Sequence, residues 1–259
     1  MEQPTTSPPH RIGTPLGRWL PGFLGIGAMR AGTTWLADNL RRHPRIWIGR
    51  KEQHFFDRHL NARRIPGIDR DREAQFRYAL RFLPGSIRGR LVGEFTPRYA
   101  ILEPETIARI REWMPDVRLL MILRDPVERA WSQARHDRPD LTTRGPAPVS
   151  ELLRFLDQPQ VRQRGDYLSC LRTWLAVFNR DQLWVTFLEH TMIDPEAVVR
   201  GTFRFLGVDD GASVGIEARP VHPSPSVPMP DRVRRHLEEI YRGTAAGLEE
   251  LIGQPIPWG

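Results

Sequence analysis

"GIGAMRAGTTWL", residues 25–36, joins the end of an apolar segment to a glycine-rich loop. The nucleotide-binding P-loop pattern consists of a glycine, four residues, a second glycine, a lysine, and then a serine or threonine. Gly27, Gly32 and Thr34 stand at the expected positions, but Thr33 replaces the lysine. Because that lysine binds the β- and γ-phosphates of a triphosphate, the stretch predicts a phosphate-binding loop for a different anion.

The segments around this loop alternate between helix and strand patterns. The run VRLLMILRDP at 117–126 contains a continuous apolar stretch, as in a strand that helices cover on both faces. We expect further strands at 21–28, 45–49, 90–95 and 182–189, and helices at 33–44, 71–85, 104–116, 125–137, 150–158, 166–178, 194–207 and 231–251. This alternation predicts an α/β fold, a three-layer α/β/α sandwich with a central, mainly parallel sheet and a P-loop-like phosphate-binding loop.

Two of the expected helices carry specific local cues. Trp35, Leu36 and Leu40 form an apolar stripe that should face the core. Asp125 and Pro126 are typical of an N-cap residue and the first helical position.

The length and composition indicate one globular domain. With 259 residues and 40% hydrophobic residues, the chain can build a substantial core and is too apolar to be disordered. We expect a flexible leader over residues 1–20 and a single domain over 21–259. A secretory signal and a membrane span are not expected, since no stretch approaches the roughly 20 apolar residues of a span. The single cysteine, Cys170, cannot form an intramolecular disulfide, so we expect a cytoplasmic location.

The charge balance favours an anionic ligand. The formal net charge of +7 suits nucleic acid, an acidic membrane surface or a phosphorylated small molecule. The sequence has no aromatic–basic strip, no zinc-ligand spacing and no helix-turn-helix pattern, so we expect neither a nucleic-acid partner nor a metal site. Only one of the 38 Lys and Arg residues is a lysine, Lys51, which makes its position informative.

Two of the predicted strands are followed by positively charged or hydrogen-bond-donating groups that can bind an anion. Ligands of open α/β sheets bind at the carboxyl ends of the strands. After the first strand, Arg30 adds a positive charge to the backbone N–H groups of a helix N-terminus. Arg124 ends the fourth strand, and Ser132 adds a hydroxyl two turns into the next helix. The alternatives are a glycine turn with an incidental arginine, and an Arg124 that pairs with Asp125 or Glu128 beside a solvated Ser132.

Together with several further motifs, these two sites resemble those of the sulfotransferases that use 3′-phosphoadenosine 5′-phosphosulfate (PAPS). GAMRAGTTWL (27–36) is similar to the family's 5′-phosphosulfate loop, and LRDPVERAWS (123–132) to its 3′-phosphate element. The resemblance runs from residue 22 to residue 208, and the heparan-sulfate-type and bacterial branches are the most similar. It includes KEQHFFD (51–57), GEFTPRY (93–99), RGDYLSCLRTWLAVF (164–178) and FLEHTMIDPEAVVRGTFRFLGV (187–208).

The resemblance implies an enzyme that transfers a sulfuryl group from PAPS without a metal. The acceptor attacks sulfur in line, and adenosine 3′,5′-bisphosphate leaves. The lysine of the family's first loop corresponds to Arg30, which keeps the charge but cannot donate a proton. Nucleotide contacts are implied for Arg30, Ala31, Gly32, Thr33, Thr34, Trp35, Arg124, Ser132 and Tyr167, and by position in a late proline-rich loop for Arg219 and His222. The alternative for Tyr167 is a core tyrosine.

The KEQHFF segment is implied to hold the catalytic groups. Glu52 matches the carboxylate that acts as general base in the heparan-type enzymes. His54 would orient Glu52 or act itself, and Lys51 would share the role of Arg30 at the sulfonate. The alternative is a surface ion pair between Lys51 and Glu52, with His54 packed beside Phe55.

The acceptor side is implied to include His54, Phe55, Glu94, Phe95, Thr96 and Tyr99. Phe95 stands where the heparan-type motif carries a lysine, which argues against a highly sulfated glycan and leaves room for an apolar acceptor. We expect a small-molecule or saccharide acceptor with a hydroxyl or, less readily, an amine; its identity and the oligomeric state stay open. Two other classes compete: a P-loop kinase, which Thr33 opposes, and a non-catalytic nucleotide- or nucleic-acid-binding protein.

Overall fold

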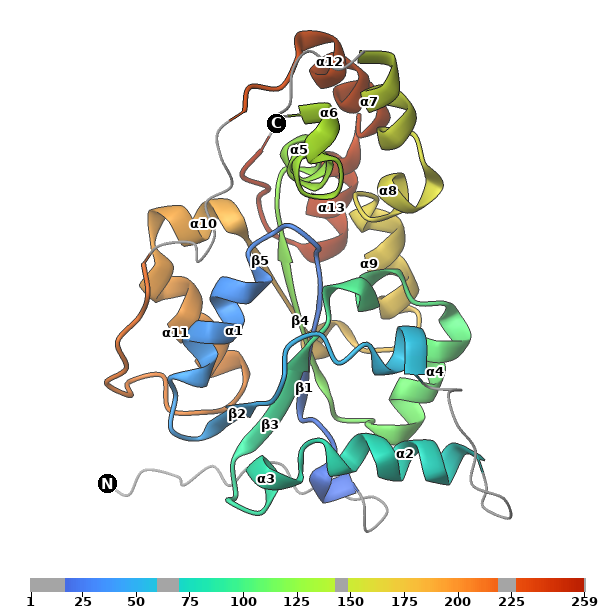
Figure 1. The fold of residues 1–259 in the computed structure, drawn as a ribbon. Helices are drawn as coiled ribbons and strands as arrows, with labels where there is room; N and C mark the ends of the chain where they lie inside the picture. The colour runs from blue at the N-terminus through green and yellow to red at the C-terminus, as the bar shows by residue number, and fades with distance from the viewer. Residues whose placement is uncertain (1–16, 60–69, 143–148, 219–226, 259) are drawn as a thin grey trace.

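A five-stranded parallel sheet forms the centre of the molecule (Figure 1). The computed structural model describes residues 17–59, 70–142, 149–218 and 227–258. Neighbouring strands are parallel in every pair, so their carboxyl ends lie at one edge. In the order β2-β3-β1-β4-β5, the strands are β1 (Phe23–Gly27), β2 (Ile46–Ile48), β3 (Leu91–Phe95), β4 (Arg118–Leu123) and β5 (Leu183–Phe187). The predicted α/β fold with a mainly parallel sheet is confirmed.

Helices cover both faces of the sheet and make the outer two layers. On one side α1 (Thr33–Arg41) packs against α11 (Pro195–Phe205), and on the other α9 (Tyr167–Leu175) packs against α4 (Pro104–Trp113) and α13 (Thr244–Ile252) (Figure 1). The remaining α-helices are α2 (Arg70–Leu80), α3 (Leu83–Ser86), α5 (Pro126–Asp137), α6 (Pro139–Thr142), α7 (Val149–Leu156), α8 (Pro159–Gln163), α10 (Leu188–Ile193) and α12 (Asp231–Ile240).

A second, smaller apolar cluster lies beyond the carboxyl ends of the strands, where α5, α7 and α12 meet (Figure 1). Trp131 of α5, Leu152 of α7 and Val233 of α12 are buried in it. The Trp131 indole also donates a hydrogen bond to the Val227 carbonyl at 3.0 Å. This packing fixes α5 above the edge of the sheet, where the polar strand ends lie.

Three predicted elements are shorter than their sequence patterns suggest. The single helix expected at 231–251 is two helices, α12 and α13, because Gly243 between them adopts a left-handed φ of 78° that glycine tolerates. The strand expected at 182–189 ends at Phe187, where α10 begins with the next residue. The helix expected at 71–85 is divided into α2 and α3.

The local helix cues are confirmed. Trp35, Leu36 and Leu40 of α1 are buried in the main core. At the start of α5, Pro126 occupies the first turn, and the Asp125 side chain accepts a hydrogen bond from the backbone N–H of Glu128 at 2.9 Å.

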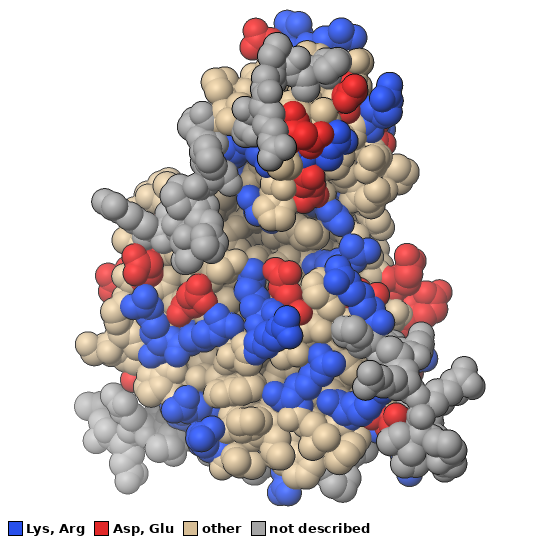
Figure 2. Space-filling view, in the orientation of Figure 1, with Lys and Arg blue, Asp and Glu red and all other residues tan. Residues whose placement is uncertain are grey.

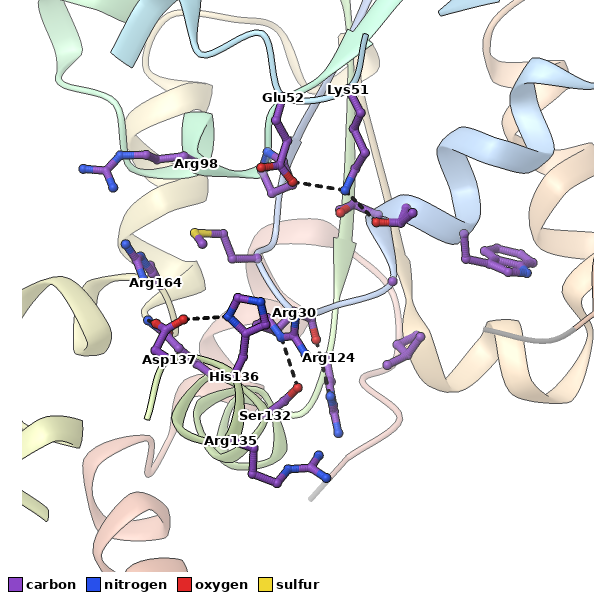
Figure 3. A pocket seen from close by; sticks show the side chains of 18 of the residues that line it. Arg30, Lys51, Glu52, Arg98, Arg124, Ser132, Arg135, His136, Asp137 and Arg164 are labelled. Carbon is purple, nitrogen blue, oxygen red and sulfur yellow. Dashed lines mark hydrogen bonds and ion pairs between the residues drawn. The ribbon is translucent and has the colours of Figure 1, made fainter. Parts of the chain in front are cut away.

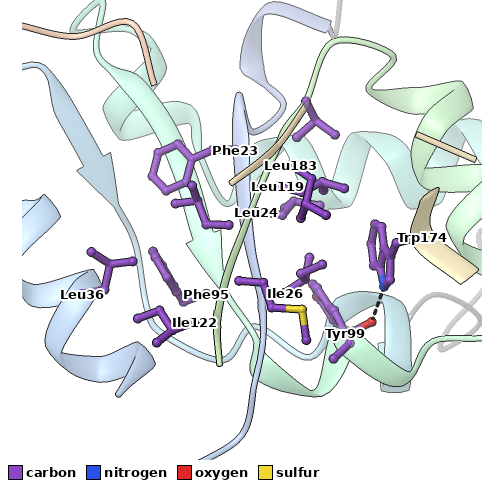
Figure 4. Close-up of a cluster of buried hydrophobic side chains, with 14 of the residues drawn as sticks. Phe23, Leu24, Ile26, Leu36, Phe95, Tyr99, Leu119, Ile122, Trp174 and Leu183 are labelled. Carbon is purple, nitrogen blue, oxygen red and sulfur yellow. Dashed lines mark hydrogen bonds between the residues drawn. The ribbon is translucent and has the colours of Figure 1, made fainter. Parts of the chain in front are cut away.

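Phe23 and Phe95 lie among the buried side chains of the core (Figure 4), and each ring packs against a glycine of the sheet. A Cβ atom at Gly25 would lie 2.0 Å from Cδ1 of Phe95, and one at Gly93 would lie 2.3 Å from Cζ of Phe23. Both rings are buried. Because the two glycines lack a side chain, the two rings can pack directly on β1 and β3.

Two side chains of α9 belong to the core. Trp174 is fully buried and donates a hydrogen bond to the Tyr99 carbonyl at 3.2 Å (Figure 4). Cys170 is also buried, and burial raises the pKa of its thiol.

Candidate active site

A cavity of about 620 Å³ opens at the carboxyl ends of β1 and β4 (Figure 3). Figure 2 shows Lys and Arg side chains gathered across the middle of this face of the molecule. The basic side chains of the cavity wall are Arg30, Lys51, Arg58, Arg98, Arg124, Arg135 and Arg164. The wall also holds two carboxylates, Glu52 and Asp137. This balance of charge suits an anionic ligand.

The loop between β1 and α1 brings backbone N–H groups to the cavity wall. Gly32 adopts a φ of 87°, in the left-handed region that favours glycine. Thr33 follows as the first residue of α1, and Gly32, as its N-cap residue, offers no side chain to cap the helix. Since the first N–H groups of a helix have no partner within it, this helix end offers hydrogen-bond donors to an anion.

The two anion sites expected from the sequence meet in this one cavity. Arg30 donates from Nε to the Ser132 hydroxyl at 3.3 Å, and Arg124 donates from Nη1 to the Arg30 carbonyl at 3.4 Å (Figure 3). Burial lowers the pKa of both guanidinium groups. Both stay charged at neutral pH, because an arginine pKa starts far above it.

The alternative expected for Arg124, an ion pair with Asp125 or Glu128, is present in part. Its Nη2 lies 3.8 Å from a carboxylate oxygen of Glu128, a long ion pair that leaves Arg124 on the cavity wall. Ser132 is only 3% exposed, so it does not lie on a solvated helix face. Tyr167 is fully buried and donates its hydroxyl to the Arg124 carbonyl at 2.9 Å, which fixes the end of β4 from behind the wall.

Lys51, Glu52 and His54 form the opposite part of the wall. Lys51 donates from Nζ to the Thr34 hydroxyl at 2.6 Å and to Oε1 of Glu52 at 3.1 Å (Figure 3). His54 lies between two carboxylates, with Nε2 3.6 Å from Oε2 of Glu52 and Nδ1 2.9 Å from Oδ2 of Asp57. The Lys51–Glu52 ion pair considered from the sequence is therefore present, and it lines the cavity.

Five residues expected near the acceptor are at most 1% exposed and do not line the cavity: Phe55, Glu94, Phe95, Thr96 and Tyr99. Their burial argues against direct contact with an acceptor, because neighbouring elements cover the end of β3. Pro97 and Arg98 of the same segment line the cavity instead.

The cavity wall also holds five polar residues that the sequence motifs did not predict: Arg58, Arg98, Arg135, His136 and Asp137. Helical spacing could have indicated two of them. Arg135 and His136 follow Ser132 by three and four positions, so they share its face of α5. Arg98 has no such signal, because a single loop arginine means little in a chain so rich in arginine.

The other predicted nucleotide contacts lie in different places. Trp35 lines the cavity and donates its indole N–H to the Glu217 carbonyl at 2.6 Å. Ala31 is fully buried and does not line it. Arg219 and His222 lie outside the described residues.

The described ranges contain no group of three His, Cys, Asp or Glu residues placed to hold a metal ion. No α-helix in these ranges combines the length and the apolar character that crossing a membrane requires.

A sequence model described as "Sulfotransferase family" matches residues 21–211. The chain belongs to this family. A sulfotransferase from Alicyclobacillus acidocaldarius has a similar structure, with a TM-score of 0.69 and 30% identity over 91% of this chain and 97% of that one. The resemblance stated from the sequence motifs is confirmed.

Curated relatives of this sulfotransferase include enzymes named for heparan sulfate. Heparan sulfate glucosamine 3-O-sulfotransferase 3B1 of Mus musculus is 30% identical over 200 residues, which is 73% of this chain and 46% of that protein. Heparan sulfate glucosamine 3-O-sulfotransferase 6 of Homo sapiens is 26% identical over 268 residues, or 93% of this chain and 75% of that protein. The match thus spans about half the length of the first relative.

Proposed function

We propose that this sulfotransferase transfers a sulfuryl group from PAPS to a hydroxyl group of a small-molecule or saccharide acceptor. The observation that carries the proposal is the position of Lys51, which joins Thr34 of the phosphate loop to Glu52 across the cavity. Anion-binding groups thus lie next to a carboxylate that can accept a proton. Sulfuryl transfer needs both, because charge develops on the leaving phosphate while the acceptor loses its proton.

The basic groups of the cavity support a donor nucleotide with two anionic ends. PAPS, when bound, supplies the sulfuryl group and leaves as adenosine 3′,5′-bisphosphate. We assign its 5′-phosphosulfate to the N-terminus of α1 together with Arg30 and Lys51, and its 3′-phosphate to Arg124 and Ser132. The fit rests on the donor set, since guanidinium groups and helix N–H groups bind phosphate and sulfate oxygens strongly.

In this proposal Glu52 is the general base. Its carboxylate takes the proton of the acceptor hydroxyl as the new oxygen–sulfur bond forms, while the bond between sulfur and the leaving phosphate oxygen breaks. His54, held between Glu52 and Asp57, orients the base. Arg30 and Lys51 neutralise the oxygens around the reacting sulfur.

The acceptor binds on the Glu52 side of the cavity, which is also lined by Arg58, Arg98 and Arg164. Phe95 points into the core and does not reach the cavity wall. The charge of the acceptor side is therefore set by these three arginines, and this positive charge does not favour an apolar acceptor. From the relatives named for heparan sulfate we take only the acceptor chemistry, a saccharide hydroxyl. The cytoplasmic location stays a prediction that rests on the single cysteine.

A transfer assay with sulfur-labelled PAPS tests the proposal. The purified chain is incubated with a panel of phenols, alcohols, aminoglycosides, glycolipids and glucosamine saccharides, and labelled product is separated from donor. Thermal-shift titrations with adenosine 3′,5′-bisphosphate, magnesium ATP and duplex DNA compare the competing classes. We expect stabilisation by the bisphosphate alone. Stabilisation by ATP or DNA instead, together with no labelled product, would contradict the proposal.

A further inference from the structure

The peptide group that joins Arg124 to Asp125 is held on both sides by side chains from other elements. The Tyr167 hydroxyl, at the start of α9, donates a hydrogen bond to the Arg124 carbonyl at 2.9 Å. Oε1 of Glu189, in α10, accepts the backbone N–H of Asp125 at 3.0 Å. Because a peptide group is planar and rigid, hydrogen bonds to its carbonyl and its N–H together fix its orientation.

The register of the sheet brings Glu189 to this place. β5 pairs with β4 in parallel, and Phe187 lies opposite Leu123 at the end of the ladder. Asp125 and Glu189 each follow two positions later, so both stand just beyond the carboxyl ends of neighbouring strands. The contact between residues 64 positions apart in the chain therefore follows from strand pairing.

Glu189 occupies a position that a nearer side chain could have taken. The residues from Asp125 to Glu128 have the spacing of a capping box, in which the last side chain accepts the backbone N–H of the N-cap residue. In the structure Glu128 contacts Arg124 and Arg234 instead, at 3.8 and 3.2 Å. A carboxylate of a distant element has replaced the local acceptor, so the end of β4 is tied to α10.

The direction of the Arg124 side chain depends on this peptide group. Arg124 lines the cavity (Figure 3), and its guanidinium lies 3.4 Å from the Arg30 carbonyl and 3.8 Å from the Glu128 carboxylate. Both contacts are longer than ordinary hydrogen bonds between these groups, so they hold the guanidinium weakly. The backbone at the end of β4 therefore has a large part in deciding where the guanidinium lies.

We propose that Glu189 and Tyr167 are positioning residues that direct Arg124 to the 3′-phosphate of the nucleotide by holding the peptide group behind it. Neither residue lines the cavity, so both act through Arg124. A guanidinium that is already in place binds an anion more tightly, because binding then has fewer groups to order. The inference rests on the proposed function, which assigns the 3′-phosphate to Arg124.

Calorimetry on the variant Glu189→Met tests the proposal, because the variant leaves the N–H of Asp125 without its acceptor. We expect binding of adenosine 3′,5′-bisphosphate to weaken about tenfold, the effect of one hydrogen bond to a charged group, and binding of adenosine 5′-phosphate to change less than about twofold. Only the bisphosphate contacts Arg124 in the proposed assignment. Unchanged affinities, or equal losses for the two nucleotides, would overturn the proposal.

Two further variants separate the hydrogen bond from the charge of Glu189. Burial lowers the pKa of Arg124, and the charges of Glu128 and Glu189 oppose this fall, so Glu189 also acts on Arg124 electrostatically. Glu189→Gln removes the charge but keeps an oxygen that accepts the N–H, and it should bind the bisphosphate nearly as wild type does. Tyr167→Phe removes only a donor and should reproduce the selective loss. A Glu189→Gln variant as weak as Glu189→Met would contradict positioning by a hydrogen bond.

Thr191→Val is the matched control on α10. Thr191 is 3% exposed and donates to the Leu188 carbonyl at 2.6 Å, so the variant loses a buried hydrogen bond of the same helix but keeps the one to Asp125. It should retain the preference for the bisphosphate. A selective loss equal to that of Glu189→Met would show that the packing of α10 in general is responsible, which refutes the assigned role.

Combination with Arg124→Ala tests the route of the effect. If Glu189 acts through Arg124, adding Glu189→Met to Arg124→Ala should cause no further loss of bisphosphate affinity, because the group that it positions is already absent. Additive losses in the double variant would mean that Glu189 supports the cavity by another route, and the proposal would be wrong.

Exchange of the Asp125 amide, followed by NMR without nucleotide, separates this inference from the proposed function. The amide should lose about tenfold in protection in Glu189→Met and keep its protection in Thr191→Val. Wild-type protein that binds both nucleotides equally would refute the proposed 3′-phosphate contact, and the inference with it, even if the amide behaves as expected. A wild-type preference for the bisphosphate that persists in Glu189→Met refutes the inference alone.

Discussion

The amine nitrogen of Lys51 lies 2.6 Å from the hydroxyl oxygen of Thr34. Thr34 lies in the first turn of α1, next to Thr33, which replaces the P-loop lysine, and Lys51 comes from the segment after β2. The single lysine of the chain therefore brings its charge to the phosphate loop from another part of the sheet. Because it also contacts Glu52, it links the donor side of the cavity to the proposed base.

Lys51→Met should lower the rate of sulfuryl transfer by at least about tenfold, since a charge-assisted hydrogen bond contributes roughly 1.5–3 kcal/mol. Lys51→Arg should keep part of the rate, because the charge is retained. Single-turnover measurements with saturating donor give the comparison. Arg50→Met removes an exposed positive charge one position earlier and should have little effect. Equal losses in the two methionine variants would mean that only the overall charge matters.

Arg124→Ala should weaken binding of adenosine 3′,5′-bisphosphate by at least about tenfold, with a much smaller effect on adenosine 5′-phosphate. The reason is the assigned contact between Arg124 and the 3′-phosphate. Isothermal calorimetry with both nucleotides measures the difference, and Arg90→Ala, an exposed arginine just before β3, controls for the lost charge. The assignment is wrong if both nucleotides weaken to the same degree.

Arg30→Ala should abolish most of the turnover, whereas Arg30→Lys should retain a useful fraction. The charge next to the sulfonate is the main requirement, and lysine is the residue that the resembling enzymes carry at this position. The Arg30–Ser132 hydrogen bond adds a test, because Ser132→Ala should cost much less than Arg30→Ala. Wild-type turnover in Arg30→Ala would leave this loop a turn without a catalytic role.

Glu52→Gln should lower turnover by about 10²–10⁴, the usual contribution of positioned proton transfer. Nucleotide affinity should not change, because the amide fills the same volume. The defect should shrink with a nitrophenol acceptor, whose acidic hydroxyl needs less help. Bisphosphate affinity and single-turnover rate are measured on the same variant, since Lys51 contacts Glu52. With an unchanged rate on an alcohol acceptor, His54 becomes the candidate base.

Glu94 should make the folded protein less stable as the pH rises. Its folded pKa of about 7 lies above the ordinary value of 4.5, so between these values the folded chain binds a proton that the unfolded chain has lost. Stability therefore falls as pH increases through this interval. The Tm of Glu94→Gln minus the Tm of wild type should become more positive from about pH 5 to about pH 8, because glutamine does not titrate. A constant difference would contradict the raised pKa.

Local patterns in the sequence were enough to predict the order of strands and helices and the phosphate loop. The Asp125 cap and the buried stripe of α1 follow from residues close together in the chain. Their physical basis is local, in hydrogen bonds to the nearest turn and in side-chain periodicity. For the same reason the pattern missed the break at Gly243, where only the backbone angle shows that the helix ends.

The roles of residues within GEFTPRY were decided only by the tertiary structure. Side chains alternate along a strand, but a sheet covered on both faces buries both sets, so alternation does not tell which ones reach the cavity. Glu94 and Tyr99 turned out to be buried, and Arg98 turned out to line the cavity.

The same holds for the contacts between strand ends. Lys51 reaches Thr34 across 17 positions, and Arg30 reaches Ser132 across 102. The sequence itself supplied these side chains and placed each after a predicted strand. Which of them meet depends on the strand order β2-β3-β1-β4-β5, and that order follows from the packing of helices and strands far apart in the chain.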